Sequence, residues 1–83
     1  MNDPNLKSSL EHLRQELGTR AEPEAQTLHG DVERYLGTEP REPSHHETLR
    51  QRLQNGLTFY EAKHPALASA IEKVLNQLIS LGL

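Results

Sequence analysis

The segment of residues 64–83 (HPALASAIEKVLNQLISLGL) most constrains the fold, because it is the longest apolar stretch and helix signals mark both its ends. Pro65 pushes the preceding residue out of the α region and suits the first position of a new helix. At about 100° per residue, a wide apolar face forms. Its centre is Leu67, Ile71, Val74, Leu78 and Leu81, widened by Ala68, Ala70, Leu75 and Ile79. A helix with so wide a face needs at least two neighbours. Gly82 predicts a Schellman ending in which Leu83 contacts Leu78.

A narrower apolar stripe lies near the N-terminus, where leucines recur at spacings of four, three and four. They are Leu6, Leu10, Leu13 and Leu17. This spacing predicts a helix with an apolar seam of coiled-coil width, beginning at Asp3-Pro4 and ending at Gly18. The seam has two interpretations: it completes a bundle within one chain, or it is the interface of a dimer.

A second helix is expected from about Pro23 to Leu36, with Gly37 closing it. Its apolar positions are again three and four apart: Ala25, Leu28, Val32, Tyr35 and Leu36. Only residues 19–22 separate it from the first helix. So short a turn predicts an antiparallel helical hairpin over residues 3–36.

Residues 37–44 (GTEPREPS) read as a linker, because they include two prolines, a glycine and no large apolar residue. Ser44 and Glu47 have the spacing of a capping box, which places the start of a third helix near His45. Its expected inner face is Leu49, Leu53, Leu57 and Tyr60, flanked by Phe59. The stripe runs in phase through Gly56, which favours one continuous helix in which Gly56 permits close approach of a neighbour. The alternative is a break at Asn55-Gly56.

The chain is therefore expected to be all-α, with two helical hairpins, residues 3–36 and 45–83, forming a small four-helix bundle. Its 83 residues make one domain, 34% hydrophobic, with a mean hydropathy of -0.75. Such a limited core often needs help from oligomerisation, so a homodimer that exchanges helices is the alternative. The absence of cysteine, of a signal peptide and of a membrane span predicts a cytoplasmic protein without disulfides.

The stretch Tyr60-Glu61-Ala62-Lys63-His64-Pro65-Ala66-Leu67, followed by an apolar helix ending Leu81-Gly82-Leu83, resembles a family of short bacterial proteins. That family is a domain of unknown function. Its pattern is a Leu-rich first helix, a charged middle, an aromatic-Glu-x-x-His-Pro corner and a terminal Gly-aliphatic pair. The resemblance implies an all-helical fold with a continuous third helix and brings no activity. Tyr60 departs from the pattern, which has Phe at this position.

Glu61 and His64 have the Glu-x-x-His spacing of helical di-metal carboxylate proteins, which require two such motifs and two more inward Glu residues. Only one motif is present, so the favoured interpretation is a structural corner of Tyr60, Glu61, His64 and Pro65 in which His64 caps the last helix. The pairs His12/Glu16 and His29/Glu33 suit solvated helix faces. The pair His45-His46 lies beside the linker and could bind a metal weakly or sense pH, but exposed loop histidines usually do neither.

No residue set in the sequence indicates catalysis. There is no cysteine, Ser8, Ser9, Ser69 and Ser80 lie in expected helices without a base, and no Gly-rich phosphate loop occurs. Arg50 and Arg52 make one helix face mildly basic. The charge argues against a nucleic-acid footprint, since residues 1–42 carry five basic and nine acidic side chains and residues 43–83 carry four and three.

The sequence thus predicts a small protein–protein interaction or structural protein that associates with itself, as a dimer, or with an unidentified protein. We expect no enzymatic activity, no cofactor and no membrane partner. Two other hypotheses remain: a metal-binding protein or metal-dependent enzyme that uses Glu61 and His64, and a nucleic-acid- or ribosome-associated factor that uses Arg50 and Arg52.

Overall fold

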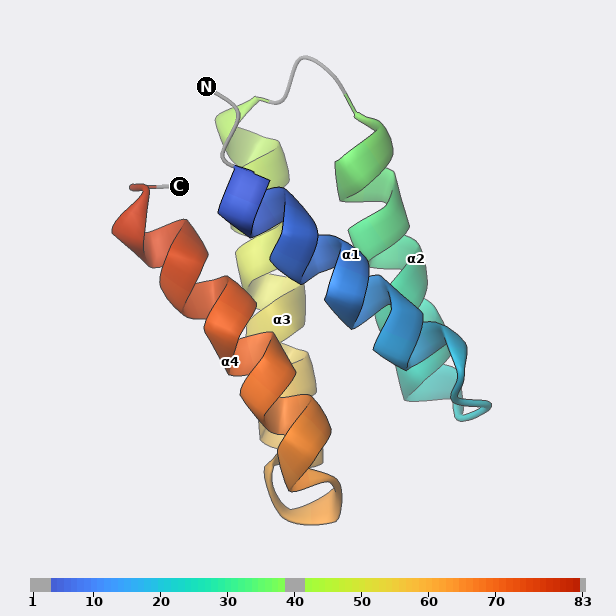
Figure 1. Cartoon of the computed structure of the whole chain (residues 1–83). Coiled ribbons are helices and arrows are strands. Elements are labelled where there is room, and N and C mark those ends of the chain that lie inside the picture. The colour runs from blue at the N-terminus through green and yellow to red at the C-terminus, as the bar shows by residue number, and fades with distance from the viewer. Residues whose placement is uncertain (1–3, 39–41, 83) are drawn as a thin grey trace.

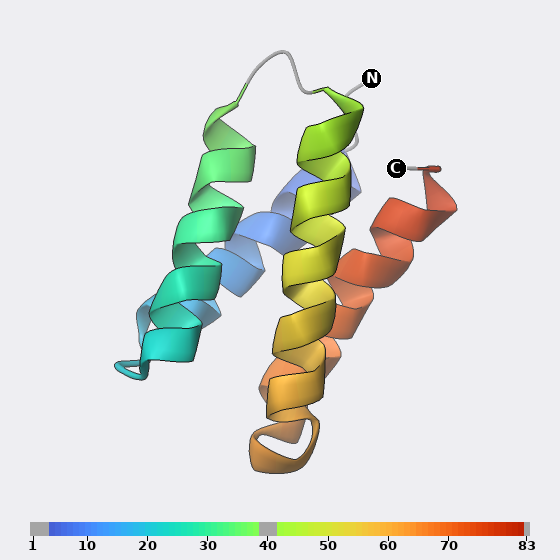
Figure 2. The same ribbon diagram turned by 180° about the vertical axis from the view of Figure 1, so that it is seen from behind.

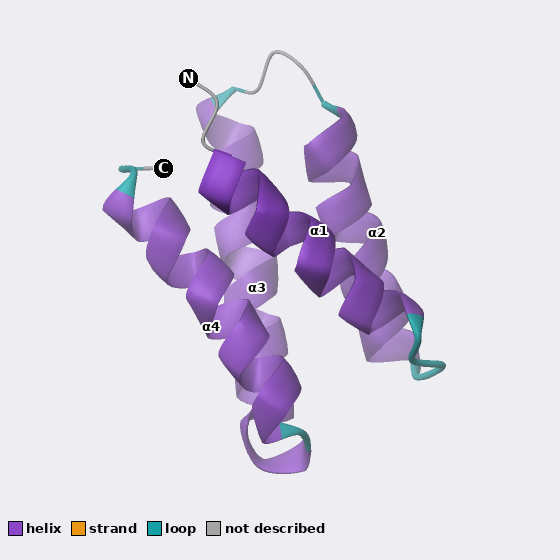
Figure 3. Ribbon diagram, in the orientation of Figure 1, coloured by secondary structure: helices purple, strands orange, loops and turns teal. Residues whose placement is uncertain are grey.

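Four α-helices joined by short connections make up the computed structural model, which describes residues 4–38 and 42–82 (Figure 1). They are α1 (Pro4–Gly18), α2 (Pro23–Gly37), α3 (Pro43–Lys63) and α4 (Pro65–Ser80). Each helix begins at a proline, whose missing N–H would have no partner within the first turn in any case. No strand occurs in the described ranges (Figure 3). The prediction of an all-α chain is confirmed.

Each helix packs against two others: α1 and α3 both contact α2 and α4. Consecutive helices run antiparallel, and α1 lies obliquely to α2 and α3 (Figures 1 and 2). The radius of gyration is 11.8 Å, close to the roughly 12 Å expected for one compact domain of this length. The two hairpins therefore pack together within a single chain, as the four-helix-bundle prediction requires.

One continuous apolar core lies between the helices. Its buried members are Leu6, Leu10, Leu13, Leu17, Ala25, Leu28, Val32, Tyr35, Leu49, Leu53, Tyr60, Leu67, Ala68, Ile71, Val74, Leu75 and Leu78, with Leu36, Leu57 and Ala70 partly buried against them. The four leucines of the α1 seam are at most 7% exposed. In this structure the seam completes the bundle of its own chain.

Gly56 lies within α3 and leaves the helix unbroken, so the prediction of a continuous third helix is confirmed. It is buried where α2 and α4 meet α3. A Cβ added at Gly56 would lie 2.8 Å from Leu28 Cδ2 and 3.5 Å from Ile71 Cδ1. A methyl group at Gly56 would therefore overlap the Leu28 side chain and make an ordinary van der Waals contact with Ile71.

The predicted start of α3 was wrong by two residues. The helix begins at Pro43, and the capping box consists of Glu42 and His45 instead of Ser44 and Glu47. Proline fixes a φ angle that suits the first helical position, so Pro43 moves the start upstream. At the other side of the connection, α2 includes Gly37 and ends in a cap at Thr38. The linker is therefore shorter than residues 37–44.

The predicted inner face of α4 was wrong at its C-terminal end, where Leu81 is 41% and Ile79 62% exposed. Both views show α4 diverging from α3 toward this end, so α3 does not cover its last turn (Figures 1 and 2). Gly82 has a φ of 76° and its N–H donates to Ile79 O at 3.0 Å, which is half of a Schellman ending. The predicted contact of Leu83 and the Asp3 cap lie outside the described residues.

Candidate functional site

The Tyr60 ring lies at the end of the bundle where the α1–α2 turn meets the α3–α4 corner. The ring is 1% exposed, and its hydroxyl donates to Glu22 Oε1 at 3.0 Å. The same carboxylate oxygen accepts from Arg20 Nε, and the Arg20 guanidinium carbon lies 5.7 Å from the Tyr60 ring centroid. The Glu22 carboxylate thus connects the α1–α2 turn to Tyr60, a residue 38 positions further along the chain.

Two further side chains extend this contact toward solvent. The Phe59 and Tyr60 rings pack edge to face with centroids 4.9 Å apart, and Lys63 Nζ lies 4.3 Å from the Phe59 centroid. Such an exposed cation–π contact stabilises by about 0.5–1 kcal/mol. We refer to Arg20, Glu22, Phe59, Tyr60 and Lys63 together as the Tyr60 cluster.

The electrostatics of the Tyr60 cluster follow from its burial and pairing. Burial raises the pKa of Tyr60 to about 12, and the hydrogen bond to Glu22 adds to this shift. The hydrogen bond from Arg20 lowers the pKa of Glu22, and the Tyr60 hydroxyl lowers it further. In return, the hydrogen bond to Glu22 raises the pKa of Arg20. Tyrosine therefore stays protonated and donates, while the carboxylate stays charged and accepts.

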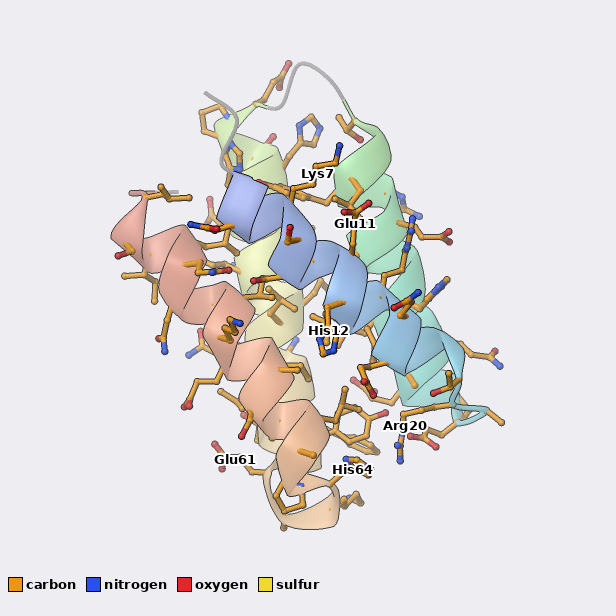
Figure 4. All side chains as sticks on the ribbon, viewed as in Figure 1. Lys7, Glu11, His12, Arg20, Glu61 and His64 are labelled. Atoms are coloured by element: carbon orange, nitrogen blue, oxygen red, sulfur yellow. The ribbon has the colours of Figure 1, made fainter. Side chains whose placement is uncertain are left out.

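His64 lies at the corner itself and caps α4, as the sequence predicted. Its Nδ1 accepts from the Leu67 N–H at 3.2 Å, and its own backbone N–H donates to Tyr60 O at 2.8 Å. Glu61 is exposed, and Figure 4 shows it on the opposite side of the corner from His64. Glu61 was predicted to stabilise the corner, but it makes no hydrogen bond or ion pair with the residues that the structure describes. The structure does not bring this pair together as a metal site.

At the opposite end of the bundle, two histidines make hydrogen bonds at the start of α3. The Glu42 N–H donates to His45 Nδ1 at 2.9 Å. The Tyr35 hydroxyl lies 2.8 Å from His46 Nδ1, and the two rings pack edge to face. Tyr35 is buried at 5% exposure, so this pair joins the end of α2 to the start of α3.

The predicted surface pairs of histidine and glutamate lie on exposed helix faces. His12 Nε2 lies 3.7 Å from Glu16 Oε1, and His29 Nδ1 lies 3.5 Å from Glu33 Oε1. Over residues 4–38 and 42–82, no three His, Asp or Glu side chains gather where they could hold a metal ion. The five histidines are accounted for by caps, helix-surface pairs and one contact with tyrosine.

The remaining candidates lie apart from each other. Arg52 Nε is 3.7 Å from Asp31 Oδ2, an oxygen that is enclosed and accepts no hydrogen bond from the described residues. Arg50 is half-buried. Ser8, Ser9 and His12 line a shallow hollow of about 260 Å³ between α1 and α4, where no hydrogen bond of the described residues joins a serine to His12. Ser69 and Ser80 line another on the outer face of α4.

Sequence reasoning identified the corner residues Tyr60, His64 and Pro65 but missed Arg20 and Glu22. Both lie in what looked like a simple turn. The one local signal is that Glu22 precedes Pro23, the position of an N-cap, although its side chain makes no capping hydrogen bond there. Its carboxylate is directed instead to Tyr60, a contact across the bundle that no local spacing indicates.

The fold and these contacts define a small all-α protein: a four-helix bundle whose α1–α2 turn is bonded to an aromatic-Glu-x-x-His-Pro corner. The chain belongs to the family described as a domain of unknown function (DUF4404), which it matches over residues 6–83. The resemblance stated from the corner residues is thereby confirmed. No curated protein and no solved structure matches the chain. Among the described helices, none has the length and apolar character that crossing a membrane requires.

Proposed function

We propose that this protein acts by protein–protein contact, as a small structural module that associates with copies of itself, and that it is not an enzyme. The observation that carries the proposal is the uncovered C-terminal turn of α4. Ile79 and Leu81 are 62% and 41% exposed there, although the core beneath them is complete. We refer to Ile79 and Leu81 as the apolar end.

The chemistry of the described residues supports this choice over the alternatives. His64 Nδ1 is engaged by Leu67, and Glu61 is directed away from it, so the pair lacks the convergence that a metal ion needs. Arg52 Nε lies 3.7 Å from Asp31 Oδ2, so one of the two arginines considered for nucleic-acid binding is paired with a carboxylate of the same chain. Burial of two large aliphatic side chains against a second copy contributes about 3–6 kcal/mol before the costs of association.

The test is the mass in solution, measured by sedimentation equilibrium from about 1 µM to 1 mM. We expect the wild-type chain to exceed its monomer mass of 9.4 kDa as concentration rises. The double variant Ile79→Lys/Leu81→Lys should stay monomeric while its circular dichroism spectrum is unchanged. Phe59→Lys is the matched control, since Phe59 is also an exposed large apolar side chain and lies at the other end of the bundle. A wild-type monomer at every concentration refutes the proposal.

A further inference from the structure

The apolar end is too small to join two chains by itself. A stable interface buries about 800 Å² on each partner, and two partly exposed aliphatic side chains supply only a fraction of that area. Self-association therefore needs a surface that continues from the apolar end. Along α4 this surface is the outer face of the helix, because among the described helices α4 packs against α1 and α3 alone (Figure 1).

The outer face of α4 has charges of opposite sign on its two sides. The side chains of Glu72 and Lys73 are both exposed, and neither makes an ion pair or a hydrogen bond with the described residues. Consecutive residues lie about 100° apart around a helix, so the uncharged Ser69 and Asn76 lie between these two side chains. Lys73 is on the side toward α1, where it lines the hollow between the two helices. Glu72 is therefore on the opposite side.

The apolar end is divided in the same way. Ile79 follows Glu72 by seven residues, which is close to two full turns, so it lies on the Glu72 side. Leu81 follows Lys73 by eight residues and lies on the Lys73 side, about 80° further round the helix. One side of the face thus presents a carboxylate and an isoleucine, and the other side presents an ammonium group and a leucine.

Symmetry decides which pairing of two copies matches opposite sides. In a two-fold dimer of parallel helices, each side of one helix faces the opposite side of the other, as the e and g positions do in a parallel coiled coil. Glu72 then faces Lys73 of the second copy, at levels that differ by about 1.5 Å along the helix axis. The contact occurs twice. An antiparallel pair brings equivalent sides together, so it never sets Glu72 against Lys73 of the other copy.

We propose that two copies of this chain associate in parallel through the outer faces of α4, with Glu72 of each paired to Lys73 of the other and Ile79 packed on Leu81. This arrangement rests on the self-association proposed above and specifies its surface and its partner. Exposed ion pairs contribute little affinity. The charges therefore select the parallel orientation, while the aliphatic side chains supply the apolar burial.

Charge reversal tests the pairing, with the dimer dissociation constant measured by sedimentation equilibrium. Glu72→Lys and Lys73→Glu each turn two attractive contacts into two repulsive ones, so each should raise this constant about tenfold or more. An equimolar mixture of the two variants should associate as the wild type does, because the lysines of one chain then face the glutamates of the other. Glu61→Lys is the matched control, since Glu61 is exposed on α3, and it should leave the constant unchanged.

Disulfide cross-linking tests the orientation independently, in a chain that has no cysteine of its own. In the parallel dimer, residues 69 and 76 each face their own equivalents. Ser69→Cys and Asn76→Cys should therefore each give a disulfide-linked dimer on mild oxidation, and Glu61→Cys should not. An antiparallel pair that joins one of the two positions to its equivalent separates the other from its own by about 21 Å. A disulfide spans no more than about 7 Å between Cα atoms.

The outcomes separate this arrangement from self-association as such. Wild-type association that neither charge reversal weakens, or cross-linking at fewer than both positions, overturns the parallel arrangement and leaves self-association standing. A wild-type chain that is monomeric at every concentration refutes self-association and the arrangement with it.

Discussion

At the residue scale, the hydroxyl of Tyr60 makes the hydrogen bond that joins α3 to the α1–α2 turn. Tyr60→Phe removes the hydrogen bond to Glu22 and leaves the ring packed, so the fold should be retained at a cost of about 1 kcal/mol. In a domain of this size the melting temperature should fall by about 4–8 °C. Urea unfolding of both proteins measures the difference. An unchanged midpoint would mean that the hydroxyl contributes nothing to stability.

The same hydroxyl predicts a response to alkali. Burial raises the pKa of Tyr60 to about 12, whereas an exposed tyrosine titrates near 10. The folded state therefore holds this proton more tightly than the unfolded state, and stability falls as the pH rises from about 10 to 12. Absorbance at 295 nm should show a step of tyrosine ionisation that coincides with unfolding. Tyr60→Phe should lack that step and lose less stability over the same pH range.

At the element scale, the packing of α2 against α3 should reverse the effect on stability that helix propensity alone predicts for replacing Gly56 by alanine. Alanine favours a helix over glycine by about 1 kcal/mol. Nothing lies within 4 Å of a Cβ at Gly30 in α2, so Gly30→Ala should stabilise by about that amount. At Gly56 the new methyl meets Leu28 Cδ2 at 2.8 Å, and overpacking costs about 1–3 kcal/mol. Gly56→Ala should therefore destabilise or be neutral.

Urea unfolding of the two alanine variants measures the contrast. Leu28→Val combined with Gly56→Ala supplies the check, because the shorter side chain makes room for the methyl group. The double variant should be more stable than the sum of the two single changes predicts. Equal stabilisation by both alanines would show that Leu28 of α2 leaves room for a methyl group at Gly56 of α3.

The elements themselves were largely predictable from local pattern. Proline positions and three-four spacings placed all four helices, and the in-phase stripe from Leu53 to Tyr60 indicated a continuous α3. Two errors remained. The helix α3 begins at Pro43, upstream of the predicted cap at Ser44, and the divergence of α4 from α3 leaves Ile79 and Leu81 exposed. The spacing of apolar residues along one helix shows neither which of two nearby residues starts the helix nor how far two packed helices diverge.

At the scale of the whole molecule, the candidate site was only half predictable. The corner of Tyr60, His64 and Pro65 could be identified because its members are adjacent in sequence and belong to a recognisable motif. Glu22 and Arg20 could not be identified from the sequence, because they contact Tyr60 only when the two hairpins have packed together. The bundle thus joins its two hairpins with polar contacts at both ends: Glu22 with Tyr60 at one, and Tyr35 with His46 at the other.

The closing helix α1 offers a test of whether one chain suffices for the fold. Leu13 is 0% exposed within its own chain, so Leu13→Ala should cost about 2–5 kcal/mol. If the seam is internal, this loss is the same at every protein concentration. If the leucines instead joined two chains, the loss would grow as concentration rises, because at high dilution both proteins are dissociated and the variant has no interface left to lose. Thermal melts of wild type and Leu13→Ala across a hundredfold dilution decide between them. We expect a constant difference, because α1 contacts both α2 and α4 of the same bundle.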